Sequence, residues 1–128
     1  MATRIQILTI DDHPYTQRLI EKLLRHRGYH ILQAENGFSG IEIARKSCPD
    51  LILLDIRLPD INGFDVLRLL RLDYHTRLIP VIAVTTQADE KYREACLKAG
   101  FTEYIAKPVM RDALYTTVQM VLGSHRNA

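Results

Sequence analysis

Five side chains that together could bind and transfer a phosphoryl group are spread along this chain of 128 residues. They are three acids, one hydroxyl and one amine: Asp11, Asp12, Asp55, Thr85 and Lys107. Carboxylates suit Mg²⁺, which prefers one or two of them together with waters and phosphate oxygens. A lysine ammonium and a hydroxyl supply the charge and hydrogen bonds by which phosphoryl transfer is generally catalysed. The residue types therefore point to metal-assisted phosphate chemistry, provided that the fold brings them together.

Each of these residues ends or directly follows a short apolar segment with the length of a β-strand. The predicted strands are residues 5–10, 29–34, 51–54, 81–84 and 103–106. Segments with helical spacing alternate with them: 14–27, about 39–47, about 64–72, 92–99 and 114–122. Pro14 is suited to a first helical turn, and Gly28, Gly100 and Gly123 are expected to end helices.

The alternation of strands and helices predicts an α/β fold. Residues 51–54 and 81–84 are apolar throughout, as strands covered on both faces must be. Helical crossovers imply parallel strands with right-handed connections. We predict one domain over residues 1–128, with a doubly wound, five-stranded parallel sheet flanked by five helices. If the strand order is 2-1-3-4-5, the first and third strands are neighbours, and Asp11, Asp12 and Asp55 converge at the sheet's switch point.

Three converging carboxylates repel one another. At ~4 Å and an effective dielectric constant of ~20, each like-charge pair costs about 4 kcal/mol. Lys107 neutralises part of this charge, and Mg²⁺ is the expected cofactor for the rest. Asp55 is central in the chain order and is the predicted phosphoryl acceptor. Taken singly, each residue also has a plain structural interpretation, such as a helix cap for Asp11 and Asp12.

Composition excludes several other classes of protein. Seventeen Lys and Arg against fifteen Asp and Glu give a net charge of +2, so no direct nucleic-acid binding is expected. The apolar runs are too short to cross a membrane, and the first residues lack a signal-peptide pattern. Two cysteines favour a reducing compartment, so we expect a cytoplasmic protein. Dinucleotide and P-loop glycine motifs are missing from the sequence, and His13 is interpreted as a solvated loop residue.

The combined motifs resemble the receiver domain of two-component response regulators, the CheY-like family. The resemblance covers about residues 5–122 and rests on Asp11-Asp12, Leu53-Leu54-Asp55, Leu58-Pro59-Asp60, Asn62-Gly63, Thr85 and Lys107-Pro108. It implies that Asp55 accepts a phosphoryl group from a phosphohistidine on a sensor kinase or phosphotransfer protein. It also implies that Asp12 and Asp55 ligate Mg²⁺ directly, that Asp11 acts through water, and that the backbone carbonyl of Arg57 is a further ligand.

The resemblance assigns the remaining residues to phosphoryl contact and signalling. Lys107 is expected to contact the acyl-phosphate oxygens and to form a cis peptide bond with Pro108. Thr85 is expected to hydrogen-bond the phosphoryl group, and Tyr104 to rotate inward in response. The fourth helix, fifth strand and fifth helix are expected to present the face that binds a downstream protein. Thr86, where the family usually has Ala or Gly, is a departure that narrows access to the acceptor.

The sequence therefore predicts a signalling receiver, whose chemistry is limited to its own phosphorylation and dephosphorylation and which is not an enzyme for another substrate. Two alternatives remain open at this stage. One is a Mg²⁺-dependent phosphohydrolase with similar topology, which would turn over a small phosphate ester. The other is an interaction module that binds its partner equally well without phosphorylation.

Overall fold

Five parallel strands form the centre of the computed structural model, which describes residues 4–87 and 89–126. They are β1 (Gln6–Ile10), β2 (His30–Ala34), β3 (Leu51–Asp55), β4 (Val81–Thr85) and β5 (Glu103–Ala106). Their order is β2-β1-β3-β4-β5, with every neighbouring pair parallel. The predicted topology is confirmed. In the register of β1 and β3, Ile10 pairs with Leu54, so the residues that follow them lie at the same edge of the sheet.

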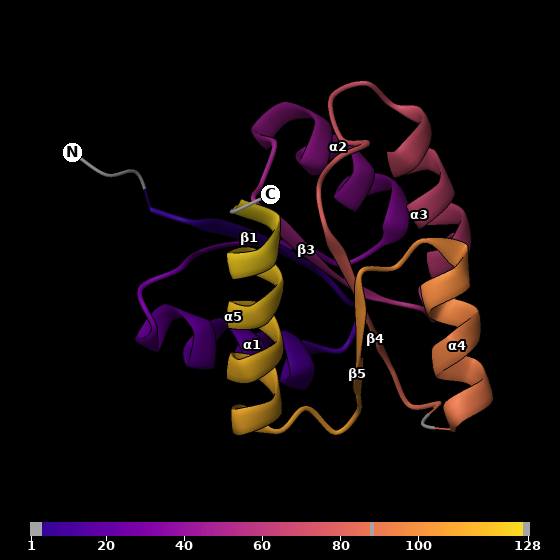
Figure 1. The fold of residues 1–128 in the computed structure, drawn as a ribbon. Helices are drawn as coiled ribbons and strands as arrows, with labels where there is room; N and C mark the ends of the chain where they lie inside the picture. Colours follow the sequence, from indigo (N-terminus) through magenta and orange to yellow (C-terminus); the bar gives the residue numbers. More distant parts are fainter. Residues whose placement is uncertain (1–3, 88, 127–128) are drawn as a thin grey trace.

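The helices form two layers, one on each face of the sheet (Figure 1). They are α1 (Pro14–His26), α2 (Gly37–Ser47), α3 (Gly63–Leu72), α4 (Glu90–Ala99) and α5 (Arg111–Arg126). One buried cluster joins the sheet to α1 and α5, and the other joins it to α2, α3 and α4. Within residues 4–87 and 89–126, no helix is both long enough and apolar enough to cross a membrane.

The apolar runs of the strands are explained by these two layers. Along β3, Leu51 and Leu53 belong to the cluster beneath α1 and α5, whereas Ile52 and Leu54 belong to the opposite cluster. All four are at most 1% exposed. Since successive side chains of a strand point to opposite faces, a strand covered twice needs apolar residues at every position. Each such buried side chain contributes about 1.5–3 kcal/mol of hydrophobic stabilisation.

Several helix boundaries differ from the sequence-based expectation: α4 and α5 begin at Glu90 and Arg111, earlier than residues 92 and 114, and two further differences have clear causes. Helix α2 begins at Gly37, not near residue 39, because the Asn36 side chain caps it by accepting the N–H of Ser39 at 2.9 Å. Helix α5 does not end at Gly123 but continues to Arg126. A glycine ends a helix when it adopts a left-handed conformation, as Gly100 does after α4 with φ +113°, and Gly123 does not.

Two glycines within helices have opposite surroundings. A Cβ on Gly40 of α2 would lie 2.4 Å from Cδ1 and 2.8 Å from Cγ1 of Ile10, a core residue of β1. Glycine at this position therefore allows the helix backbone to approach the sheet closely. A Cβ on Gly123 of α5 would have no atom of the described residues within 4 Å.

Substituting these two glycines with alanine should shift stability in opposite directions. Gly40→Ala is expected to lower the free energy of unfolding by about 1–3 kcal/mol, because the added methyl group overpacks the contact with Ile10. Gly123→Ala gains the same helix propensity without a clash and should raise the free energy of unfolding by about 0.5–1 kcal/mol. Urea unfolding of both variants measures this difference. Equal stabilisation by the two substitutions would contradict the packing argument.

Candidate functional site

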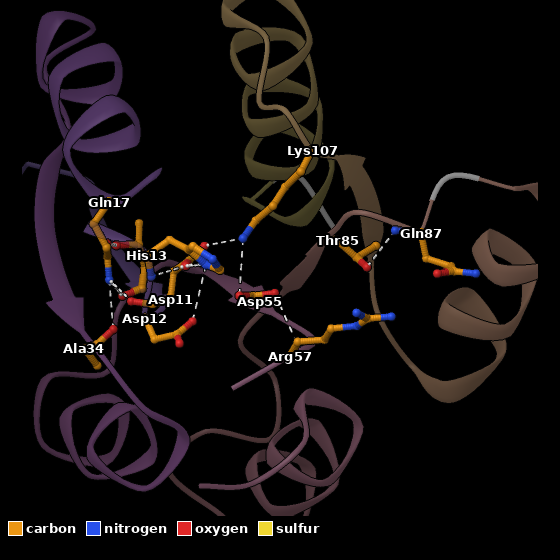
Figure 2. A network of polar contacts seen from close by, with 11 residues as sticks. Asp11, Asp12, His13, Gln17, Ala34, Asp55, Arg57, Thr85, Gln87 and Lys107 are labelled. Carbon is orange, nitrogen blue, oxygen red and sulfur yellow. Dashed lines mark hydrogen bonds and ion pairs between the residues drawn. The ribbon is translucent and has the colours of Figure 1, made fainter. Parts of the chain in front are cut away.

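The three acids converge at the carboxyl ends of β1 and β3 (Figure 2). Asp11 follows β1 and is 3% exposed, Asp55 is the last residue of β3 and is 4% exposed, and Asp12 lies at the surface. Ligand-capable atoms of Asp11, Asp12, His13 and Asp55 all lie within 4.8 Å of one another. The switch point of the sheet therefore holds a compact acidic cluster, as the strand-end argument predicted.

Lys107 reaches this cluster from the end of β5. Its Nζ lies 3.1 Å from Oδ2 of Asp11 and 3.3 Å from Oδ2 of Asp55, and the side chain is mostly buried. The Lys107 N–H donates to the carbonyl of Thr85 at 2.7 Å, and the Lys107–Pro108 peptide bond is cis. One ammonium is thus shared by two buried carboxylates, and the cluster keeps a net negative charge.

The surroundings of Asp55 and Asp11 show that the cluster lacks positive charge and a hydrogen-bond donor. Burial raises the pKa of Asp55, and the charge of Asp11 raises it further. The ammonium of Lys107 and the N–H of Arg57, which donates to Oδ1 at 3.1 Å, act in the opposite direction, but the pKa stays above its ordinary value. Oδ2 of Asp11 is buried, and although the Lys107 ammonium lies 3.1 Å from it, no described group is oriented to donate a hydrogen bond to it. A hydrated divalent cation would offset the charge and donate to this oxygen, so the residues fit Mg²⁺.

Thr85 and Tyr104 are linked through the backbone of Gln87. Thr85 is buried at the end of β4, next to β3, and its Oγ1 accepts the N–H of Gln87 at 3.1 Å. The Tyr104 hydroxyl, from the edge strand β5, donates to the carbonyl of Gln87. A continuous path of hydrogen bonds therefore runs from the acidic end of the sheet to the edge strand.

His13 lies beside the acids but is largely in solvent. Its side chain is 65% exposed, and its Nδ1 is 3.5 Å from Asp11 Oδ1 and 3.4 Å from Asp12 Oδ1. His13 also occupies the capping position of α1, and its N–H donates to Oδ1 of Asp11 at 2.8 Å. The interpretation of His13 as a solvated residue is confirmed. The cap residue itself is His13, and Asp11 takes part in the cap region of α1 by accepting the N–H of this residue.

Two residues that organise the site were missed by the sequence analysis. Gln17 of α1 is buried, and its amide donates to the carbonyl of Asp11. The sequence does contain a sign of this role, because Gln17 is a polar residue at helical spacing from the apolar residues Ile20 and Leu24. All three are buried in the structure. The second residue is Asp60, for which the sequence analysis quoted a motif but gave no role.

Asp60 ties the loop after β3 to the start of α2. Its carboxylate accepts the N–H groups of Gly37 at 2.8 Å, Phe38 at 2.9 Å and Ile61 at 2.9 Å. The first two belong to the first turn of α2, where backbone N–H groups lack partners within the helix. Burial acts to raise the pKa of Asp60, but the N–H groups of Phe38, Gly37 and Ile61 together hold it below its ordinary value.

Gly63, the first residue of α3, fixes the other end of the same loop. Its N–H donates to the carbonyl of Ile56 at 2.7 Å. A Cβ at this position would lie 2.7 Å from Cα of Ile56 and 2.9 Å from the carbonyl oxygen of Asp55. Both are backbone atoms that no side-chain rotation can move away, so only glycine allows α3 to start this close to Asp55.

Comparison with known proteins identifies the family. A model of the response regulator receiver domain matches residues 7–119. Protein PilH of Pseudomonas aeruginosa is 38% identical over 118 residues, covering 92% of this chain and 98% of PilH. The polar-differentiation response regulator DivK of Brucella anthropi is 34% identical over 117 residues, covering 91% of this chain and 95% of DivK.

Solved structures agree with these sequence matches. The receiver domain of the sensor histidine kinase PA1611 from Pseudomonas aeruginosa, with a magnesium ion coordinated in its active site cleft, is 36% identical with a TM-score of 0.86. That match covers 94% of this chain and 99% of the other. A response regulator from Desulfuromonas acetoxidans is 30% identical with a TM-score of 0.85, covering 92% and 96%.

Fold and site together define a CheY-like α/β domain with an acidic cluster at its switch point that could hold a metal ion. The chain belongs to the response regulator receiver domain family. It is therefore a receiver domain of two-component signalling, as the resemblance implied.

Removal of the Asp60 carboxylate should weaken the junction between the acceptor loop and α2. Asp60→Ala is expected to lower the free energy of unfolding at neutral pH by roughly 0.5–2 kcal/mol, the usual cost of losing a helix cap. Because the folded-state pKa of Asp60 is lowered, the carboxylate stabilises the fold above the ordinary aspartate pKa, and this contribution disappears as pH falls through the lower folded value. Urea unfolding at several pH values measures the difference.

The exposed Asp112, paired with Arg111 at 3.2 Å, provides the control. Asp112→Asn should leave the urea midpoint nearly unchanged. If Asp60→Ala lowers the free energy of unfolding no more than Asp112→Asn does, the Asp60 carboxylate does not stabilise α2. The same conclusion follows if the loss in Asp60→Ala persists at strongly acidic pH.

Proposed function

We propose that this protein is a phosphorylation-controlled receiver in which Asp55 takes a phosphoryl group from a phosphohistidine on a sensor kinase or phosphotransfer protein. The observation that carries the proposal is the position of the Asp55 carboxylate. It is buried at the switch point of the sheet, with the Lys107 ammonium at 3.3 Å and Asp11 beside it. A buried, metal-compatible carboxylate with a fixed cation beside it is equipped to attack phosphorus.

In the proposed reaction, a carboxylate oxygen of Asp55 attacks the phosphorus atom opposite the imidazole nitrogen of the donor. The O–P bond forms as the N–P bond breaks, and the released imidazole nitrogen retains the bonding electron pair and takes up a proton. The Lys107 ammonium is held in advance by Asp11 and Asp55, so it offsets charge on the phosphoryl oxygens without reorganisation. The protein's chemistry is limited to this transfer and to hydrolysis of its own acyl phosphate.

The acidic cluster is the proposed Mg²⁺ site. Asp12, Asp55 and the backbone carbonyl of Arg57 would be direct ligands, and Asp11 would bind through water. When bound, the ion supplies positive charge to the carboxylates and to the transferring phosphoryl oxygens. The buried Oδ2 of Asp11, which has the Lys107 ammonium at 3.1 Å but no described hydrogen-bond donor, is suited to accept a hydrogen bond from a coordinated water.

The proposed switch uses the path from Thr85 to Tyr104. A phosphoryl group on Asp55 presents acceptor oxygens toward the end of β4, and the Thr85 hydroxyl would turn to donate to one of them. This movement withdraws Oγ1 from the Gln87 N–H, and the carbonyl of Gln87 in turn holds the Tyr104 hydroxyl. Displacement of Gln87 would free Tyr104 to rotate inward. The face formed by α4, β5 and α5 would then change its affinity for a downstream protein.

Phosphorylation at Asp55 is tested directly with acetyl phosphate and Mg²⁺. The wild-type chain should gain one phosphoryl group by intact mass, and Asp55→Asn should gain none, because the Asp55 carboxylate is the proposed acceptor, lies at the metal site and accepts a hydrogen bond from Lys107. Asp65→Asn removes an exposed acid of α3 and serves as the control that keeps the mass shift. An undiminished shift in Asp55→Asn would disprove the assignment, and multiple turnover of a phosphate ester would identify a phosphohydrolase instead.

The role of Thr85 is tested with beryllofluoride, which mimics a phosphoryl group on aspartate. One charge-assisted hydrogen bond of ~1.5–3 kcal/mol changes a two-state population ratio by roughly ten- to a hundredfold. Thr85→Ala should therefore bind the mimic but lose most of the amide chemical-shift changes around Tyr104 and α4. Thr85→Ser, which keeps the hydroxyl, should restore them, and Thr86→Ala, which alters the exposed neighbour, should leave them intact. A full response in Thr85→Ala would show that the signal follows another route.

A further inference from the structure

Gln17 is a buried amide on the apolar side of α1. It is 7% exposed and shares the buried stripe of this helix with Ile20 and Leu24. A polar side chain in such a place costs free energy unless its hydrogen bonds are satisfied. The contacts of Gln17 therefore show what the buried amide does.

The Gln17 side chain makes all of its hydrogen bonds to the end of the sheet that bears the acids (Figure 2). Its Nε2 donates to the carbonyls of Asp11 at 2.9 Å and Ala34 at 2.8 Å. A third carbonyl, that of Thr9, lies 3.3 Å away. The Thr9 hydroxyl donates to Oε1, which orients the amide so that its nitrogen faces the carbonyls.

These bonds join the carboxyl ends of the neighbouring strands β1 and β2. The N–H of Asp11 donates to the carbonyl of Ala34 at 3.0 Å, so both sides of Asp11 are tied to this point. The carbonyl of Asp11 belongs to the peptide group that leads into Asp12. Fixing this carbonyl fixes the plane of that peptide, and with it the direction in which the Asp12 side chain leaves the backbone.

Asp12 depends on this support because its own side chain is weakly held. It is exposed, and within the described part of the chain the one ion-pair contact of its carboxylate is with Nδ1 of His13, at 3.4 Å, a side chain that is itself 65% exposed. An apolar residue in place of Gln17 would leave the Asp11 carbonyl buried without this donor. Rotation of the peptide toward water would relieve that cost and would carry the Asp12 carboxylate away from Asp55.

We infer that Gln17 is a positioning residue for the metal site, holding the Asp11–Asp12 peptide so that the Asp12 carboxylate faces Asp55. The inference rests on the proposed Mg²⁺ site. Outer groups that orient metal ligands typically change metal affinity by about 10–100-fold when they are removed. Gln17 acts through backbone, and its own side chain does not touch the ion or the phosphoryl group.

The test measures Mg²⁺ affinity and stability separately in the unphosphorylated protein. Gln17→Met keeps the length of the side chain but removes the amide, and it should raise the Kd for Mg²⁺ in an NMR titration by about tenfold or more. Thr76→Val is the matched control. Thr76 is fully buried in the connection between α3 and β4, and its hydroxyl donates to the Leu70 carbonyl at 2.7 Å, away from the acids. This control loses one buried hydrogen bond and should keep the wild-type Kd.

A second readout needs no metal. Amide hydrogen exchange at Asp12 and His13 in metal-free protein should be faster in Gln17→Met than in Thr76→Val at equal global stability. If Gln17→Met does not fold, Thr9→Val, which retains Gln17 but removes the hydroxyl that orients it, should weaken Mg²⁺ binding in the same direction.

The outcomes separate this inference from the proposed function. A wild-type chain that binds Mg²⁺, together with a Gln17→Met variant that loses urea stability but keeps the wild-type Kd, would overturn the positioning role alone. A wild-type chain that does not bind Mg²⁺ would overturn the proposed metal site and the inference together.

Discussion

The sharing of one ammonium by two buried carboxylates is the interaction on which the site depends. Asp11 and Asp55 lie at the carboxyl ends of the adjacent strands β1 and β3, and Lys107 reaches both of them from the end of β5. Burying two carboxylates side by side would be costly without the Lys107 ammonium. A single ammonium balances only one of the two negative charges. One edge of the sheet therefore carries an uncompensated negative charge, which the proposed metal ion and phosphoryl group would change.

The loops around this charge are held by side chains that bind backbone atoms of other segments. Gln17 ties the end of β1 to the end of β2, and Asp60 ties the acceptor loop to the first turn of α2. Thr85 and Tyr104 are joined differently, through a single residue of the loop after β4. The acidic side of the site is thus held by several independent side-chain contacts, whereas the Thr85 and Tyr104 side chains are connected through the backbone of one residue. This asymmetry suits the proposed switch, in which the acids keep their positions while Thr85 and Tyr104 move.

Much of the fold could be predicted because its signals are local. Apolar strands followed by Asp11, Asp55 and Thr85 indicate both the parallel sheet and the edge at which the residues meet. The start of α2 was misjudged because Asn36 and Gly37 give a turn signal and a helix-cap signal in the same two residues. Gln17 and Asp60 were missed because their partners are set by tertiary structure. Asp60 lies 23 residues from Gly37, and no periodicity links the two. Helix α5 continues beyond Gly123 because this glycine does not adopt the left-handed conformation that ends a helix, and a glycine in a sequence is compatible with either conformation.

The close approach of Gly63 to the backbone of Asp55 and Ile56 sets a constraint on chain length. The connection from β3 to α3 is anchored at both ends, by the strand and by a glycine in backbone contact, and it is held in its middle by Asp60. An inserted or deleted residue here would either detach α3 from Asp55 or pull Asp60 away from α2. In this chain, a change of loop length should be tolerated better at the opposite edge of the sheet, where the connections between helices and the next strands lie away from Asp55. The number of residues between Asp55 and Gly63 is therefore constrained by the structure more tightly than the lengths of the other connections.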